Sequence, residues 1–283
     1  MKKTLYLLLC TALIIAGLSG CTSDDRKYTV VKLMPTDIST EMLEEPPTMD
    51  LPTEIIPETT EEDVMYNRFK EQQEIFSNPK IDVNTRIETF LQSNFGNYKI
   101  DFFDNFDNIN EDLNYLILNN AIHNGSVYRT TGKIGDGLTK EMIDANIIYA
   151  FGDIISKLDF SSLDSSLDAT YDDELEIYVP GCYGAPGHVL YVFHNIENVN
   201  DNIYKTVVSY IGNEGDLLAF DLDGEWTNAP EYIHEMTEQS RGEATEEFIK
   251  YIKENPGQYE RTELFLEIGD DYIRLLSAKK YTD

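Results

Sequence analysis

Apolar residues recur at three- and four-residue intervals between residues 61 and 152, a spacing that predicts amphipathic helices. Ser77-Asn78-Pro79 ends the first of these helices. The N-cap positions of three further helices are held by Asp82, Asn110 and Thr139. Gly152 has the position of a C-terminal glycine at the end of the last one. The first half of the folded part is therefore expected to be helical.

After Ser161 the apolar period changes to two, which is typical of half-buried strands. A helix near Thr245 to Glu254 interrupts the strands, and Asp223-Gly224 and Gly269-Asp270 predict tight turns, with a positive φ expected at Gly269. The predicted strands are "ELEIYVPG", "HVLYVFHNI", "YKTVVSYIG", "DLLAFDLDG", "TELFLEI" and "YIRLLSAK". This order predicts an α+β fold, in which N-terminal helices are followed by an antiparallel β-meander with a C-terminal hairpin and the helices cover one face. An NTF2-like or cystatin-like sheet fits the same order by analogy.

The apolar run at the start of the chain predicts a signal peptide rather than a membrane span. Lys2 and Lys3 precede it, and Leu5 to Ala16 is too short to cross a bilayer, which needs ~20 residues. The run ends at Leu18-Ser19-Gly20-Cys21, which resembles the lipobox of bacterial lipoproteins. The resemblance implies that residues 1–20 are removed and that Cys21 is acylated. An ordinary signal peptide or a short membrane anchor is the alternative.

Residues 21–60 predict a disordered, acidic, Pro-rich tether. Half of the ten prolines fall between Pro35 and Pro57, and the surrounding charge is one-sided. Such a segment lacks the apolar surface needed to offset ordering, and Pro with like charges keeps it extended. We expect a single ectodomain over residues 61–283, held away from the membrane by this tether.

The net charge of −30 excludes binding to nucleic acid through phosphate contacts, because those contacts need Lys and Arg. Anionic headgroups also repel such a chain, so the acyl anchor at Cys21 would have to hold it at the membrane. Solubility explains the charge, and divalent cations or a basic partner remain open. With Cys10 in the signal peptide and Cys21 acylated, Cys182 is left without a disulfide partner.

Reactive side chains gather in "GCYGAPGHVLYVFH", which holds Cys182, His188 and His194. A thiol nucleophile with a histidine base and an N/S metal site are the two chemical interpretations. Along one straight strand, however, the two histidines stand too far apart to bind one ion. The spacing favours a turn that enters a strand, so we assign no catalytic residue, no metal site and no cofactor.

Two acidic segments are the remaining candidates. In "FDLDGEW", Asp221 and Asp223 resemble part of a calcium loop, but Trp226 replaces its obligatory glycine, which favours an Asp-Gly hairpin turn. "DFFDNFDNINED" (residues 101–112) interleaves acids with phenylalanines. Such a surface could bind sugars or cations, whereas a partly buried loop with solvated acids is the simpler interpretation.

The second half of the chain resembles a recurrent type of Firmicutes lipoprotein. The resemblance rests on Tyr149-Ala150-Phe151-Gly152, on Tyr171-Asp172-Asp173-Glu174, and on the glycine-bearing turn and meander that follow. It implies a lipid-anchored protein on the extracytoplasmic face of the membrane, with no known chemistry. We therefore expect a cell-surface lipoprotein with a non-catalytic binding or interaction ectodomain. An exported hydrolase acting on cell-wall or carbohydrate polymers and a chaperone-like helper are the alternatives.

Overall fold

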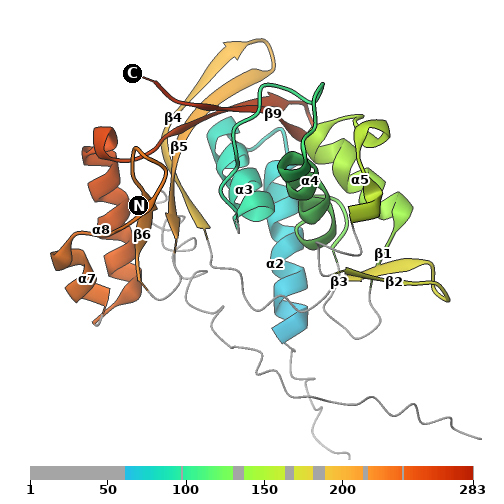
Figure 1. Cartoon of the computed structure of the whole chain (residues 1–283), viewed down its shortest axis with the longest axis horizontal. Coiled ribbons are helices and arrows are strands. Elements are labelled where there is room, and N and C mark those ends of the chain that lie inside the picture. The colour runs from blue at the N-terminus through green and yellow to red at the C-terminus, as the bar shows by residue number, and fades with distance from the viewer. Residues whose placement is uncertain are drawn as a thin grey trace, which may run out of the picture.

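The computed structural model of the chain describes residues 61–96, 98–129, 137–162, 169–180, 189–212, 216–237 and 239–282. Helices come first and strands dominate the second half, which is the predicted α+β order with an antiparallel meander (Figure 1). The helices are α2 (Glu61–Phe76), α3 (Val83–Phe95), α4 (Glu111–His123), α5 (Lys140–Phe151), α7 (Glu231–Thr237) and α8 (Arg241–Glu254). The strands are β1 (Leu138–Thr139), β2 (Ala169–Asp172), β3 (Ile177–Pro180), β4 (Val189–Asn200), β5 (Ile203–Gly212), β6 (Leu218–Phe220), β7 (Trp226–Asn228), β8 (Thr262–Ile268) and β9 (Ile273–Lys280). Short 3-10 helices are η2 (Ile155–Lys157), η3 (Phe160–Ser162) and η4 (Pro256–Gln258).

Side-chain caps begin three of the helices where the sequence predicts them. Asp82, Asn110 and Thr139 each accept a hydrogen bond from the backbone N–H three residues further on, at 3.0, 2.9 and 3.3 Å. A cap of this kind is worth ~1 kcal/mol. Gly152 ends α5 with φ +85°, which an L side chain rarely adopts. Local signals therefore fix the ends of these helices.

β5 is the centre of the six-stranded antiparallel sheet. It pairs with β4 along one side, and with β6 and β8 along the other. The outer strands β7 and β9 extend the order to β7-β6-β5-β8-β9. A register shift between Phe193 and Asn195 places a bulge at His194. A separate three-stranded sheet has the order β1-β3-β2.

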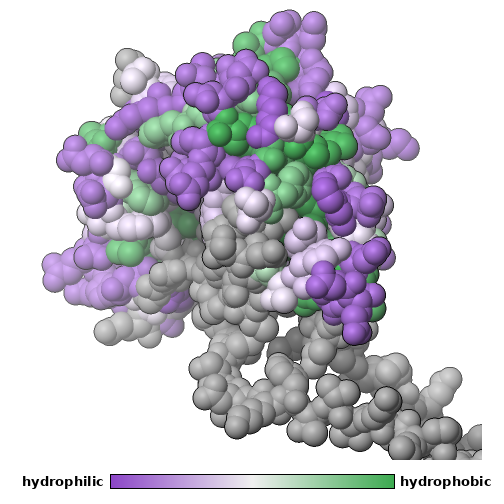
Figure 2. All heavy atoms as spheres, turned by 45° about the vertical axis from the view of Figure 1, so that its right-hand side comes forward, coloured by the Kyte–Doolittle hydropathy of each residue, from purple (hydrophilic) through white to green (hydrophobic). Residues whose placement is uncertain are grey.

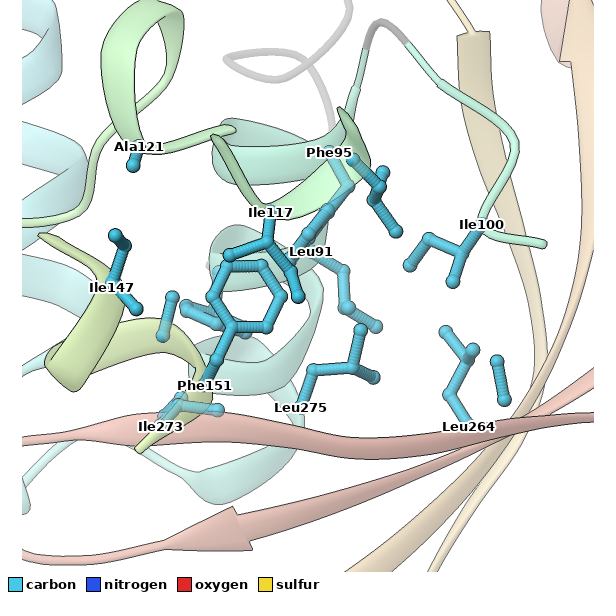
Figure 3. Packing of buried hydrophobic residues seen from close by; sticks show 14 of the residues in the cluster. Leu91, Phe95, Ile100, Ile117, Ala121, Ile147, Phe151, Leu264, Ile273 and Leu275 are labelled. Carbon is cyan, nitrogen blue, oxygen red and sulfur yellow. The ribbon is translucent and has the colours of Figure 1, made fainter. Parts of the chain in front are cut away.

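The larger core lies between this sheet and helices α2 to α5. Strand β8 alternates buried and half-buried positions, so Leu264, Leu266 and Ile268 share the face toward the helices, as predicted. In Figure 3, side chains of the helical layer and of β8 and β9 meet: Leu91, Phe95, Ile117, Ile147, Phe151, Leu264, Ile273 and Leu275. Burying one such side chain contributes ~1.5–3 kcal/mol.

A second core lies on the opposite face of the sheet, so the expectation that helices cover only one face is wrong. Neighbouring residues of a strand point to opposite faces, and Tyr210 belongs to the larger core whereas Ile211 belongs to the second. There α8 contributes Phe248 and Ile252. This helix begins at Arg241, because the Ser240 hydroxyl caps it, and not at Thr245. Sequence patterning did not predict α7, which covers the same face.

The turn between β8 and β9 is held by a buried arginine. Arg86 of α3 donates from Nη2 to the carbonyl oxygens of Gly269 at 2.8 Å and Asp270 at 3.2 Å, and from Nε to Phe76 O at 2.9 Å. The positive φ expected at Gly269 is wrong, since among the described glycines Gly152 and Gly224 hold that conformation. Gly269 is needed for another reason, because an added Cβ would overlap the Tyr272 ring.

Polar residues cover much of the visible surface of the helical and small-sheet side, with hydrophobic residues in smaller patches between them (Figure 2). This distribution agrees with the acidic composition of the chain. Large apolar side chains that stay exposed are therefore of interest as contact sites.

Candidate functional site

The structure brings together the two acidic segments that the sequence singled out. Lys99, at the start of the loop after α3, lies with its Nζ 2.7 Å from Glu260 Oε1. The same ammonium is 4.1 Å from the centroid of the Phe220 ring at the β6–β7 hairpin and 5.8 Å from that of Phe102. Lys99 is thus the point at which the loop, the hairpin and the start of β8 meet.

Trp226 extends this cluster across the hairpin. It is the one tryptophan of the chain and the cross-strand partner of Phe220, with ring centroids 3.8 Å apart. Its indole crosses the backbone of β5 at Gly212, where an added Cβ would lie 2.7 Å from the ring. The exposed fractions are 45% for Trp226, 44% for Phe102 and 51% for Leu222. We call the following residues the aromatic surface: Lys99, Phe102, Phe220, Leu222 and Trp226.

The hairpin beside this surface is an Asp-Gly turn, as the sequence favours. Asp221 Oδ1 accepts hydrogen bonds from the backbone N–H of Asp223 at 2.9 Å and of Glu225 at 3.0 Å. Gly224 has φ +82°, and an added Cβ there would lie 3.2 Å from Glu260 Oε2. The Asp221 carboxylate therefore shapes the turn. The described residues hold no group of three or more His, Cys, Asp or Glu side chains arranged for a metal ion.

Beneath the aromatic surface lies a buried polar floor. Glu260 is 3% exposed, and its contact with Lys99 is an ion pair by distance, since Oε1 makes no aligned hydrogen bond. The hydroxyls of Tyr210 and Thr262 are buried close to each other without a formed hydrogen bond. Burial raises the pKa of the Tyr210 phenol above its usual range, so it stays neutral. This polar floor therefore consists of the Glu260 carboxylate, which Lys99 holds in place, and the neutral hydroxyl groups of Tyr210 and Thr262.

Asp101, next to Phe102 in sequence, carries a perturbed carboxyl group. Partial desolvation of the carboxyl raises the pKa of Asp101, although much of this residue is exposed. The ammonium of Lys99 opposes the rise, whereas Asp112 and Glu260 add to it. Desolvation is the largest of these causes, so the raised pKa of Asp101 reflects partial burial first and neighbouring charges second.

Residues 101–110 form the phenylalanine-rich loop, and apart from Phe102 it is a partly buried loop with solvated acids. Phe106 is buried, and the backbone of Phe103 pairs with Ala278 at the edge of β9. Asp104 and Asp107 are exposed at ion-pair distance from lysines, at 3.5 Å from Lys279 and 3.1 Å from Lys157. The simpler interpretation holds for this part of the segment, and Phe102 is its exposed exception.

A serine and a histidine meet on the other face of the sheet, but the direction of the hydrogen bond between them is wrong for nucleophilic catalysis. His194 Nε2 lies 3.0 Å from Ser209 Oγ, and Ser209 Oγ lies 3.0 Å from Glu260 O. A carbonyl oxygen only accepts, so the serine donates its single proton there and accepts from the histidine. A serine nucleophile needs the reverse arrangement. Burial, with Arg261 and Lys253 as further causes, lowers the pKa of His194 to about 4, so the ring is neutral near pH 7.

A shallow hollow of about 410 Å³ lies at the edge of the sheet where β9 meets the phenylalanine-rich loop. Ile203, Phe265 and Leu276 give it an apolar lining, and Asp104 and Lys279 lie beside them. Asp104 and Lys279 are 3.5 Å apart, so the charge at this rim is balanced. The hollow lacks the exposed aromatic faces of the aromatic surface.

Several predicted residues lie outside the described residues, namely Cys21, the tether, Cys182 and His188. Their roles stay predictions. Conversely, sequence reasoning missed Lys99 and Glu260. Glu260 lies between Pro256-Gly257, which ends a helix, and the predicted strand "TELFLEI", but one acid among 52 Asp and Glu residues carries no distinguishing sequence signal.

Comparison with known proteins adds no relative to this description. Within the described part of the chain, no helix has both the length and the apolar character needed to cross a bilayer. No family model matches the chain, and neither a curated protein nor a solved structure is significantly similar to it.

Proposed function

We propose that the chain is a lipid-anchored cell-surface lipoprotein whose ectodomain binds a partner through the aromatic surface. The observation that carries the proposal is that Phe102, Leu222 and Trp226, each more than two-fifths exposed, belong to the two segments that meet at the ion pair of Lys99 with Glu260. Large aromatic side chains are enriched where proteins bind partners, and leaving them in water is unfavourable for a monomer. The anchor at Cys21 and the tether before residue 61 belong to the same proposal, which rests for them on the lipobox resemblance.

Buried neighbours give this surface a fixed shape before any partner arrives. Phe220 is packed between Trp226 and Lys99, and Lys99 is held by Glu260. A preformed surface loses less conformational entropy on binding than a mobile one. The arrangement therefore supports recognition of a partner by a rigid contact.

Site-specific photo-crosslinking on living cells tests the proposal. A benzophenone-bearing phenylalanine analogue replaces Phe102 in the full-length protein, and the matched control carries it at Tyr232, an exposed aromatic residue of α7. We expect a discrete crosslinked species from position 102 and none from position 232. Absence of an adduct at position 102, with normal folding and surface display, would refute binding through the aromatic surface.

A further inference from the structure

We infer that the partner of the aromatic surface is a basic protein segment that inserts an arginine side chain against Trp226 and Phe102. This inference rests on the proposed function and names the chemical class of its partner. The guanidinium would stack on the exposed rings, and its positive charge would meet the acidic rim.

The aromatic surface already shows an affinity for cations within the protein itself. The Lys99 ammonium lies 4.1 Å from the Phe220 ring centroid, which is the distance and geometry of a cation–π contact. Trp is the most favourable ring for such a contact, and Trp226 extends the same stack with 45% of its surface open to solvent. A second cation therefore has a suitable ring next to the first.

Charge at the rim favours a cationic partner. Two of the nearby lysines are committed, since Lys99 pairs with Glu260 and Lys279 lies 3.5 Å from Asp104. A third, Lys280, donates to Leu222 O at 3.1 Å. Against these three lysines, the loop, hairpin and floor contribute six carboxylates, which are Asp101, Asp104, Asp221, Asp223, Glu225 and Glu260. The local imbalance is negative, as is the whole chain at −30, so a basic segment is attracted both at long range and on contact.

Arginine fits this surface better than lysine does. Its planar guanidinium stacks flat on an aromatic face while its edges donate to carboxylates, whereas an ammonium is a compact, strongly hydrated charge. Asp223 and Glu225 are exposed acids of the same hairpin, three residues and one residue before Trp226 in the sequence. An arginine stacked on Trp226 would therefore bring its positive charge to a hairpin that carries exposed acids.

Peptide binding to the full-length protein in non-ionic detergent tests the inference. The peptide carries three arginines separated by glycines, and matched peptides carry lysine or neutral citrulline instead. Trp226 is the one tryptophan, so its fluorescence reports on this surface directly. We expect saturable binding of the arginine peptide at about 150 mM salt, where long-range attraction is largely screened. The lysine peptide should bind about fivefold more weakly, and the citrulline peptide should not bind.

Calorimetry with variants assigns the contact. We expect Trp226→Leu and Phe102→Leu each to weaken binding of the arginine peptide about fivefold to tenfold. The control Tyr232→Leu should leave it unchanged. Because Trp226 also packs on Phe220, a second variant avoids the packing question: Asp223→Asn with Glu225→Gln removes two exposed charges and should reduce both the affinity and its salt dependence.

Equal affinity for the arginine and lysine peptides, or affinity that is unchanged in Trp226→Leu and in the charge variant, would overturn the inference. Failure of the arginine peptide together with a crosslinked adduct at position 102 would overturn the partner class alone and leave the binding function standing. Failure of both experiments would remove the binding function as well.

Discussion

Protonation of His194 should destabilise the folded protein as the pH falls below 6.5. The imidazole donates from Nε2 to Ser209, and the cations of Arg261 and Lys253 are close enough to disfavour a further positive charge. Burial first, and these cations second, lower its pKa from 6.5 to about 4. The folded pKa is below the unfolded one, so the unfolded chain binds the proton more tightly. Stability is then fully present above pH 6.5 and is lost as the pH falls toward 4.

The size of the loss follows from the two pKa values. Lowering the pKa of His194 from 6.5 to about 4 corresponds to roughly 3 kcal/mol once the ring is fully protonated. Between pH 7 and pH 5 only part of this is lost, about 2 kcal/mol. Because the ring is half-buried and water still reaches part of it, we take this figure as an upper value.

Urea unfolding at pH 7 and pH 5 measures the effect in the parent protein and in His194→Gln. Glutamine keeps a donor for Ser209 but does not titrate, so the variant should lose less stability between the two pH values. The carboxylates titrate in both proteins, and their contribution cancels in the comparison. His234→Gln is the control, because His234 is more than half exposed. Equal losses in the parent and in His194→Gln would refute the reasoning.

Four further changes test other parts of the structure. Arg86→Met removes three hydrogen bonds to backbone carbonyls and should cost about 3–5 kcal/mol of unfolding free energy, measured by urea titration. Asn119→Leu should stabilise the protein by ~1 kcal/mol in the same assay, because both amide atoms of this fully buried side chain lack partners. Gly212→Ala should shift the fluorescence of Trp226, since the new methyl group displaces the indole; an unchanged spectrum would contradict the packing. Cys21→Ala should abolish metabolic labelling with a fatty acid, and equal labelling would contradict the lipobox interpretation.

Local signals made much of the fold predictable. The caps at Asp82, Asn110 and Thr139 and the alternation in β8 depend on residues within a few positions of one another, which sequence displays directly. Long-range packing was not predictable in this way. Period-two patterning does not say which face of a sheet a later helix covers. The sequence therefore predicted the helix α8 but not its position on the second face of the sheet, and it did not predict α7. The contacts of Gly269 with the Tyr272 ring and with Arg86 of α3 are likewise tertiary, and the turn sequence does not display them.

The candidate site was predictable only in fragments. Phe102 and Trp226 stood out in two separate acidic segments, but nothing in the sequence indicated that they meet. Their meeting depends on Lys99 and Glu260, which are far apart along the chain and ordinary in type. A site assembled by tertiary contacts from common residues leaves no motif for sequence reasoning to find.

The central position of β5 has a consequence for the order of folding. Strands β4 to β7 follow one another and pair with their sequence neighbours, so this meander can form from local contacts. The β8–β9 hairpin pairs with β5 only after α7 and α8 have intervened in the sequence. Its apolar side chains form part of the core against which α2 to α5 pack. We therefore expect α2 to α5 to remain loosely packed while the chain is being synthesised, and to consolidate in one late step once residues 262–280 have docked.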